Sequence, residues 1–128
     1  MIKLCYDMDG VICEDISEVP GTKAYVEALK SVKSLSAPHH DNIDIVTGRT
    51  EQYRKYTENW LKQHNITYKQ LIMKPISLKG VKYTPKFKAD YYRKTNAVLF
   101  IESCPKQAER IAQLSKKPVF CFENKTLY

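Results

Sequence analysis

The chain has 128 residues, of which 43% are hydrophobic and 27% charged, and its formal net charge is +7. This length and composition predict one domain over residues 1–128 with a substantial core, and they exclude a membrane-spanning helix and a second domain. The first residues lack the long apolar stretch of a signal peptide, so we expect a cytoplasmic protein without a membrane partner, and the positive charge favours phosphate or nucleic acid as a partner.

Short apolar runs alternate with amphipathic stretches in the first half of the chain, a pattern typical of βα units and a parallel sheet. Residues 2–6 predict the first strand, and residues 22–34 predict a helix with apolar side chains at helical spacing. Residues 42–47 predict the second strand. Residues 53–61 form the clearest helix, because their apolar side chains recur at i, i+3, i+4, i+7 and i+8.

The second half continues the same alternation. Residues 70–73 predict a third, short strand, and residues 74–85, with prolines, a glycine and several lysines, predict a loop. A weaker helix follows at residues 87–94, and the uninterrupted apolar run at residues 97–101 is typical of a central parallel strand. The last predicted elements are a helix that begins at Pro105 and a fifth strand at residues 119–122. The sum is a three-layer α/β/α sandwich around a five-stranded, mostly parallel, Rossmann-like sheet.

Cysteine spacing bears on redox state and metal binding. The four cysteines are Cys5, Cys13, Cys104 and Cys121, and no two of them have a Cys-x-x-Cys spacing. Two of them lie in apolar, strand-like runs, where cysteine packs as a small hydrophobic residue. We therefore expect four reduced thiols and no zinc site.

Polar side chains follow three of the predicted strands. They are Asp7 and Asp9 after the first strand, Thr47, Gly48 and Arg49 after the second, and Glu102 and Ser103 after the fourth. Because open α/β sheets bind ligands at the carboxyl ends of their strands, one crevice can collect these residues. Converging carboxylates can hold Mg²⁺, and a hydroxyl, a backbone amide and a lysine can bind phosphoryl oxygens. The pattern outlines a phosphoryl-transfer site, whereas an Asp-x-Asp pair alone is more often two ordinary loop acids.

These residues carry a family resemblance. Asp7-Met8-Asp9-Gly10-Val11, Thr47-Gly48-Arg49, a downstream lysine and an acid after the fourth strand resemble, in order, the four motifs of the haloacid dehalogenase (HAD) superfamily. The resemblance spans nearly the whole chain. It implies a HAD-type fold and a magnesium-dependent phosphatase that hydrolyses phosphoric monoesters.

The resemblance also implies individual roles. Asp7 would attack phosphorus to form an aspartyl-phosphate, and Asp9 would protonate the leaving oxygen and later deprotonate water. Asp7, the backbone carbonyl of Asp9, and Glu102, directly or through water, would hold the Mg²⁺. Thr47 would orient the phosphoryl group.

Several lysines lie in the part of the chain where the third motif is expected. Lys88 is favoured because it stands in the helix that leads into the fourth strand, and Lys86 and Lys74 are the competitors. We expect Gly48, Arg49 and Lys74 to bind substrate.

The sequence departs from the family pattern after the fourth strand. Many relatives carry a second acid close to the first, whereas here Glu102 is followed by Ser103-Cys104-Pro105. This difference predicts weaker metal binding or even a degenerate site, although the intact Asp7 and Asp9 argue against degeneracy.

The substrate class follows from what the chain lacks and from a local similarity. Residues 10–42 and 49–88 are too few for a folded cap domain, and capless relatives leave the crevice open to large substrates. Thr47-Gly48-Arg49, Tyr53-Arg54 and the segments 57–60 and 71–73 are similar to the phosphatase domain of bacteriophage polynucleotide kinases, which removes 3′-phosphates from nucleic-acid ends. The implied substrate is a nucleotide or a nucleic-acid phosphate end, with a sugar or other small phosphate as the alternative.

A basic rim would suit such a polyanion. We expect it at Arg49, Arg54 and the lysines of residues 74–88, with Tyr83 and Tyr91 as candidates for stacking on a base. Two other functions stay open: a non-catalytic phosphate- or nucleic-acid-binding module on the same fold, and a phosphoacceptor domain resembling a response regulator. The sequence does not indicate an oligomeric state.

Overall fold

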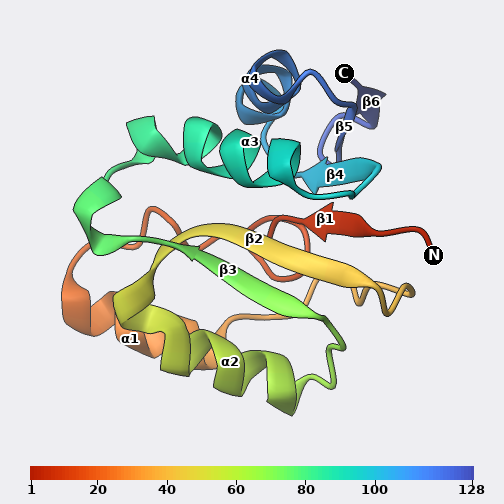
Figure 1. Cartoon of the computed structure of the whole chain (residues 1–128). Coiled ribbons are helices and arrows are strands. Elements are labelled where there is room, and N and C mark those ends of the chain that lie inside the picture. Colours follow the sequence, from red (N-terminus) through yellow and green to blue (C-terminus); the bar gives the residue numbers. More distant parts are fainter.

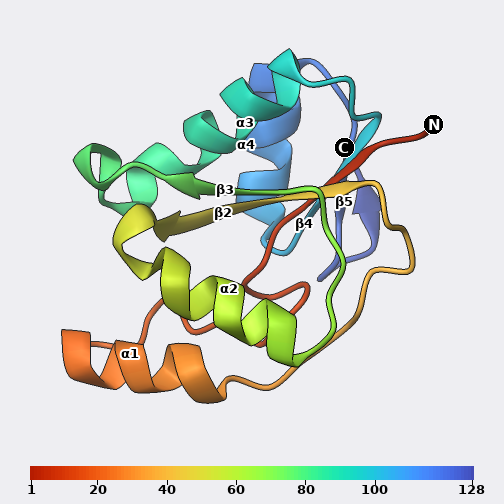
Figure 2. The same ribbon diagram turned by 60° about the horizontal axis from the view of Figure 1, so that its bottom comes forward.

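A single six-stranded sheet lies between two pairs of helices in the computed structural model, which describes all 128 residues. Helices α1 (Thr22–Ser31) and α2 (Arg54–Gln63) cover one face of the sheet, and α3 (Thr84–Lys94) and α4 (Pro105–Ser115) cover the other (Figure 1). The view of Figure 2, in which the bottom of the molecule comes forward, shows the same two helical layers. The predicted α/β fold with four helices is therefore present.

The strands are β1 (Leu4–Tyr6), β2 (Ile43–Thr50), β3 (Gln70–Lys74), β4 (Leu99–Glu102), β5 (Val119–Cys121) and β6 (Thr126–Leu127). Their order in the sheet is β3-β2-β1-β4-β5-β6, and the first five run parallel. One α-helix stands between each two consecutive parallel strands along the chain, which is the kind of crossover that parallel strands require. Short 3₁₀ turns are η1 (Glu51–Tyr53), η2 (Ile76–Leu78) and η3 (Val81–Tyr83).

The prediction of five strands was wrong, because β6 adds a sixth that pairs antiparallel with β5. Both residues of β6 are exposed, so the strand lacks the apolar run from which buried strands are predicted. It forms because the chain turns back at Lys125, whose φ of 56° lies in the left-handed region. The sheet is therefore mixed, with one antiparallel edge strand.

Most element boundaries also differ from the sequence-based expectation by one to three residues. Helix α1 ends at Ser31, earlier than predicted, and α3 begins at Thr84, three residues before the predicted start. Strand β2 continues to Thr50, beyond its predicted end at residue 47. The residues 75–83, predicted as a loop, contain only the two 3₁₀ turns.

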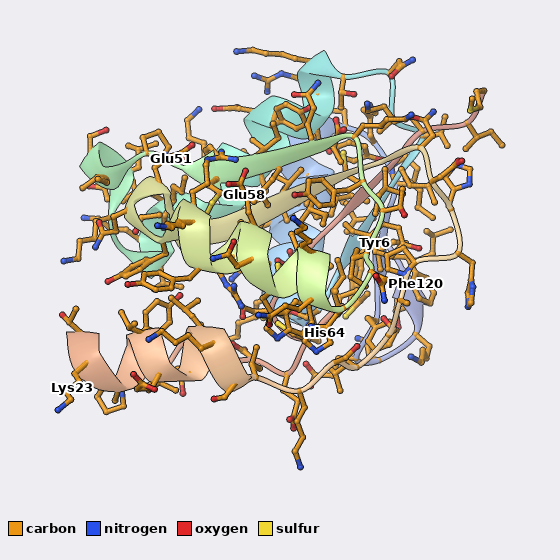
Figure 3. All side chains as sticks on the ribbon, turned by 90° about the horizontal axis from the view of Figure 1, so that it is seen from below. Tyr6, Lys23, Glu51, Glu58, His64 and Phe120 are labelled. Atoms are coloured by element: carbon orange, nitrogen blue, oxygen red, sulfur yellow. The ribbon has the colours of Figure 1, made fainter.

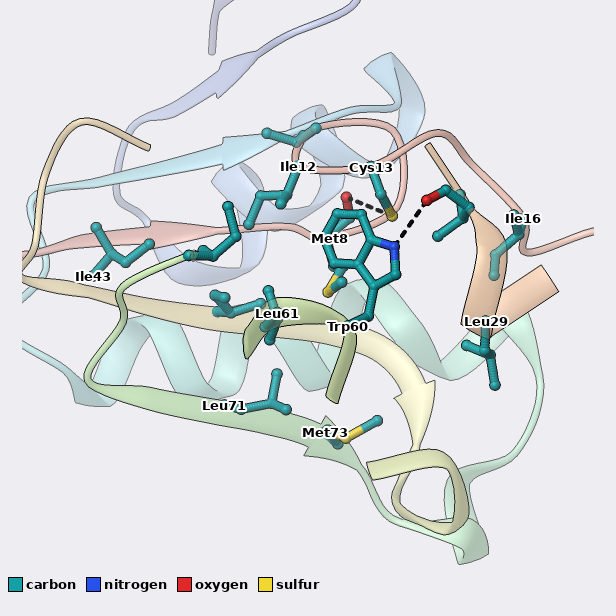
Figure 4. Packing of buried hydrophobic residues seen from close by; sticks show 14 residues of the cluster. Met8, Ile12, Cys13, Ile16, Leu29, Ile43, Trp60, Leu61, Leu71 and Met73 are labelled. Carbon is teal, nitrogen blue, oxygen red and sulfur yellow. Dashed lines mark hydrogen bonds between the residues drawn. The ribbon is translucent and has the colours of Figure 1, made fainter. Parts of the chain in front are cut away.

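Two apolar clusters hold the layers together. On the α1 and α2 face, Trp60 and Leu61 pack against Ile45 of β2 and Leu71 of β3. The indole Nε1 of Trp60 donates a hydrogen bond of 2.8 Å to the carbonyl oxygen of Val32, which satisfies its only polar atom (Figure 4). On the other face, buried side chains of α3 and α4 pack against Cys5, Val46, Phe100, Val119 and Cys121 of the sheet.

The two helical layers do not cover the sheet equally. Tyr6 and Phe120 lie beside α1 and α2, not beneath them, when the molecule is seen from below (Figure 3). A hollow of about 550 Å³ opens there, lined by Tyr6, Val11, Ser36, Ala37, Pro38, His39, His40, Ile101, Phe120 and Phe122.

All four cysteines are free. No helix combines the length and apolar character needed to cross a membrane.

Candidate active site

The first acidic residues stand on a tight turn at the carboxyl end of β1. The backbone carbonyl of Met8 accepts bonds from the amides of Val11, Ile12 and Cys13, which folds the chain back at once. Gly10 has a φ of 85°, and a Cβ there would lie 2.6 Å from Cβ of Ser103. Only glycine satisfies both constraints, so the Asp-x-Asp-Gly pattern brings the turn against the end of β4.

A bulge shapes the second motif. Thr47 pairs with Met73 and Thr50 pairs with Lys74, so Gly48 and Arg49 are extra residues on β2 that oppose none on β3. The amide of Arg49 donates to Oγ1 of Thr47 at 3.1 Å, which stabilises the bulge locally. Bulges redirect side chains next to binding sites. Here the bulge points Arg49 towards the turn after β1, where it reaches Asp9.

Asp7 and Lys88 form the centre of the site. Nζ of Lys88, in α3, donates to Oδ1 of Asp7 at 2.9 Å and to Oε1 of Glu102 at 2.8 Å. Gln107 Oε1 is a third acceptor at 3.4 Å, so the ammonium has a partner for each of its protons. Burial alone lowers the pKa of Lys88, but the Asp7 and Glu102 carboxylates outweigh it and hold that pKa above its usual range. Lys88 is therefore charged.

Both carboxylate oxygens of Glu102 accept hydrogen bonds from protein groups. Its Oε1 accepts from Lys88, and its Oε2 accepts from the backbone amides of Ser103 and Cys104 at 3.0 and 3.2 Å. The Ser103 hydroxyl lies 3.2 Å from the same Oε2 and 3.1 Å from Oδ2 of Asp7. In this arrangement Glu102 positions Lys88 and the turn after β4, and both of its oxygens accept hydrogen bonds from protein groups.

Two buried carboxylates, those of Asp7 and Glu102, face one buried ammonium group, that of Lys88. Asp7 is 4% exposed and Glu102 is 1% exposed, and Lys88 is the one lysine that contacts them. Burial raises the pKa of Asp7 well above its ordinary value of 3.8, Glu102 raises it further, and Lys88 only partly opposes this. Two buried carboxylates therefore share one lysine, and a bound cation would favour the ionised form of Asp7.

Asp9 makes no hydrogen bond to Asp7, Lys88 or Glu102 and pairs with Arg49. The guanidinium donates from Nε to Oδ2 at 3.0 Å and from Nη2 to Oδ1 at 2.8 Å. Arg49 also donates from Nη1 to Oγ1 of Thr57 at 3.1 Å and from Nη2 to Sγ of Cys13 at 3.4 Å. Arg49 is 4% exposed, so it does not lie on an exposed rim as expected, and its binding of substrate stays a prediction.

The three candidate lysines occupy very different places. Lys88 contacts Asp7 directly, whereas Lys86 is exposed and pairs with Asp90 at 2.8 Å. Lys74 is 2% exposed, and its Nζ donates to the carbonyl of Gly80 at 2.8 Å and to Oγ1 of Thr84 at 2.9 Å. Burial and the nearby Lys88 both lower the pKa of Lys74. Lys74 therefore anchors the segment after β3.

Thr47 and Gly48 lie at the same edge but make no hydrogen bond to Asp7. Thr47 is fully buried, and Gly48 packs so closely on α3 that a Cβ would lie 2.8 Å from Cγ2 of Thr84. Sequence reasoning missed Thr84, Gln107 and Thr57 as partners of the site. All three stand on helices, and only the structure reveals their contacts with Lys74, Lys88 and Arg49.

A hollow of about 530 Å³ opens beside the cluster, lined by Gly10, Asp15, Ser103, Cys104, Phe122, Glu123 and Lys125. It is lined by Gly10 of the first motif and by Ser103, which contacts Asp7, whereas neither residue lines the slightly larger hollow beside Tyr6 and Phe120. We therefore regard the one beside Gly10 and Ser103 as the approach to Asp7.

The site offers few protein oxygens that could bind a magnesium ion. No group of three or more His, Cys, Asp and Glu side chains is arranged to hold a metal. However, Oδ2 of Asp7 accepts only from Ser103, and the backbone carbonyl of Asp9 accepts no hydrogen bond in the turn. Mg²⁺ commonly binds through one or two protein oxygens and completes its shell with water and substrate phosphate. Oδ2 of Asp7 and the backbone carbonyl oxygen of Asp9 match that requirement.

Comparison with known proteins adds information on the fold. No protein-family model matches the sequence, and no curated protein matches it significantly. Among solved structures, the chain is similar to a chain of the Pnkp1/Rnl/Hen1 RNA repair complex, with a TM-score of 0.73 and 15% sequence identity. The alignment covers 94% of this chain and 42% of that chain, so this chain spans less than half the length of its match. At this identity the likeness shows a common fold.

Proposed function

We propose that the chain is a magnesium-dependent phosphomonoester hydrolase of the HAD type that acts on nucleotides or nucleic-acid phosphate ends, with residues 1–128 as one catalytic domain. The observation that carries the proposal is the buried Asp7 carboxylate with Lys88 at 2.9 Å, at the carboxyl edge of a parallel sheet. A buried acid with a raised pKa beside a fixed lysine is costly for stability and useful for chemistry. The fold shared with a chain of an RNA repair complex supports a nucleic-acid substrate.

The first chemical step uses Asp7 as the nucleophile. One carboxylate oxygen of Asp7 forms a bond to phosphorus while the bond from phosphorus to the leaving oxygen breaks, and the other oxygen would serve the metal. Lys88 neutralises charge on Asp7 and on the incoming phosphate. Asp9 gives its proton to the leaving oxygen, and the product is an aspartyl-phosphate on Asp7 and a free alcohol.

The second step returns the enzyme to its starting state. Water attacks the phosphorus of the aspartyl-phosphate, Asp9 takes the water proton, and the bond to Asp7 breaks to release inorganic phosphate. Asp7 and the Asp9 carbonyl would hold Mg²⁺, which supplies charge neutralisation to the phosphate when bound. Glu102, which already accepts from Lys88 and from two backbone amides, would act on the ion directly or through water.

The test is a phosphate-release assay on mononucleotides, on oligonucleotides with 3′- or 5′-phosphates, and on a sugar phosphate, with and without Mg²⁺. We expect turnover that needs Mg²⁺ and favours a nucleotide or an oligonucleotide end, and that is lost in Asp7→Asn. Preference for the sugar phosphate would assign the protein to small-molecule phosphatases. Absence of turnover on every phosphomonoester would overturn the proposal.

A second candidate is a phosphate- or nucleic-acid-binding module without catalysis. It is favoured by Ser103, which stands where many relatives have a second acid, and by the protein donors that occupy Glu102. Such a module would bind an oligonucleotide in a salt-dependent way, Asp7→Asn would bind equally well, and neither protein would release phosphate.

A further inference from the structure

A stretch of the chain beside the candidate active site is strongly basic. Between Glu58 and Asp90 the sequence contains seven lysines and no acidic residue. Lys74 and Lys88 of this stretch are buried in or next to the site, whereas the other five are exposed. The exposed lysines nearest to the site in sequence belong to residues 75–86, which connect β3 to the first turn of α3.

The segment 75–83, here called the lysine loop, is fixed to the catalytic edge. Lys74, the last residue of β3, donates through Nζ to the carbonyl of Gly80 in the middle of the loop and to Thr84 at its end. Thr84 packs directly on Gly48 of the second motif. The loop therefore begins and ends against the residues that are proposed to bind phosphate. Figure 1 shows the connection beyond the carboxyl ends of β2 and β3.

The lysine loop exposes apolar as well as charged groups. Val81 is 76% exposed, Ile76 is 53% exposed and Tyr83 is 39% exposed. They alternate with the exposed Lys79 and Lys82, and Nζ of Lys82 lies 5.0 Å from the centre of the Tyr83 ring. The other tyrosine considered for stacking, Tyr91, is not available in the same way because its hydroxyl donates to Asp44, near the opposite end of β2.

We propose that the lysine loop binds the single-stranded nucleic-acid segment adjoining the phosphorylated end, with Lys79 and Lys82 on its phosphates and Tyr83 stacked on a base. Positive side chains along a backbone path and an exposed aromatic ring are the two features by which proteins bind single strands. Lys86 contributes less, because Asp90 already pairs with it. This inference rests on the proposed function and names the part of the substrate beyond the scissile phosphate.

A double substitution, Lys79→Ala with Lys82→Ala, tests the charge contribution. We expect KM for a 3′-phosphorylated oligonucleotide to rise about tenfold, and the salt dependence of binding to weaken by about 1.4 in log–log slope, at about 0.7 for each single-strand phosphate contact. The kcat on a small phosphomonoester should not change, because neither lysine contacts Asp7.

The matched control is Lys62→Ala with Lys94→Ala. It lowers the net charge by the same two units, from +7 to +5, at exposed lysines in the last turns of α2 and α3, away from the lysine loop. The control should leave oligonucleotide binding nearly unchanged. Equal effects of the two double variants would overturn the proposal, because general attraction to a basic protein would then explain the binding.

The Tyr83→Ala and Tyr83→Phe pair tests stacking. We expect Tyr83→Ala to weaken oligonucleotide binding about fivefold or more, and Tyr83→Phe to bind like the unaltered protein, since a base stacks on either ring. An equally large effect of both variants, or none from Tyr83→Ala, would overturn the stacking assignment.

Binding measured in an Asp7→Asn background, by fluorescence anisotropy with a labelled oligonucleotide, separates this proposal from the proposed function. Failure of the phosphatase proposal alone would leave binding that still depends on Lys79 and Lys82. Failure of the present proposal alone would leave turnover that is indifferent to the lysine loop. Equal capture of polyglutamate and oligonucleotide by the loop would identify a general polyanion surface and also overturn it.

Discussion

Arg49 binds Asp9 through two parallel hydrogen bonds, from Nε to Oδ2 at 3.0 Å and from Nη2 to Oδ1 at 2.8 Å. The planar guanidinium fixes both the direction and the rotation of the carboxylate, which a single point charge does not. Asp9 is the proposed proton donor, and a proton donor works only at the correct angle to the leaving oxygen. The second motif thus supplies the residue that orients Asp9, the proposed proton donor of the first.

Arg49→Lys should separate this geometry from charge. Lysine keeps the positive charge but makes only one of the two bonds, so we expect a loss of about 1.5–3 kcal/mol in the free energy of unfolding and a clear fall in kcat. The matched control is Arg54→Lys, because Arg54 also binds a carboxylate, Glu51, through two bonds but at the surface. That exposed pair should contribute less than about 1 kcal/mol. Urea unfolding and phosphate release on both variants would show whether they differ as expected.

Asp7→Asn should abolish turnover and stabilise the fold. The amide keeps the shape of the side chain but removes a buried negative charge that faces Glu102, and Lys88 retains Glu102 as its partner. We expect a gain of about 0.5–2 kcal/mol, the usual size when a functional residue is replaced by one that suits stability. Thermal unfolding in the absence of divalent cations measures it. A variant less stable than the parent would show that the Asp7–Lys88 bond contributes more than the burial of Asp7 costs.

The same pair of proteins should differ in pH dependence. The pKa of Asp7 is raised in the folded state, so the folded protein holds the proton more tightly than the unfolded chain does. Stability from this group is therefore complete below the ordinary value of 3.8 and is lost as the pH rises through the folded-state pKa. The stability gained by Asp7→Asn should grow with pH over that range and then level off. A gain independent of pH would contradict this origin.

Much of the site was predictable because its geometry follows from strand direction. Asp7, Thr47 and Glu102 each follow an apolar run, and parallel strands place their carboxyl ends at one edge. The choice of Lys88 agrees with its contact to Asp7, since a residue in the first turns of α3 faces that edge. These features can be predicted from the order of the strands and helices and from the direction of the parallel strands.

Other features could not be predicted because they depend on local irregularity. The bulge at Gly48 leaves no periodic signal, yet it points Arg49 at Asp9 and not at solvent. Similarly, the sequence around Lys74 is compatible with binding substrate and with anchoring a loop. Its hydrogen bonds to Gly80 and Thr84, which show that it anchors the loop, are visible only in the structure. Strand β6 is too short and too exposed to produce a pattern.

Ser103→Asp should make the stability of the protein depend on magnesium. The Ser103 hydroxyl lies 3.1 Å from Oδ2 of Asp7, so a carboxylate there would add a like charge beside a buried acid. We expect the variant to unfold at a lower temperature than the parent without Mg²⁺ and to regain stability as Mg²⁺ is added, because ligand bound only to the folded state stabilises it. Ser103→Asn, of similar size and uncharged, is the control and should respond to Mg²⁺ no more than the parent. A Ser103→Asp protein that ignores Mg²⁺ would argue against a metal site at Asp7.

Gly48→Ala should destabilise the fold through a single contact with α3. A Cβ at Gly48 would lie 2.8 Å from Cγ2 and 3.1 Å from Oγ1 of Thr84, and overpacking of this kind costs about 1–3 kcal/mol. Adding Thr84→Ser removes Cγ2 but keeps the hydroxyl that accepts from Lys74, so the double variant should regain most of the loss in urea unfolding. Gly21→Ala is a useful contrast, because its Cβ would meet nothing within 4 Å and its cost comes from a φ of +84°. Thr84→Ser should not rescue Gly21→Ala, and rescue of both would mean that the serine stabilises the protein by another route.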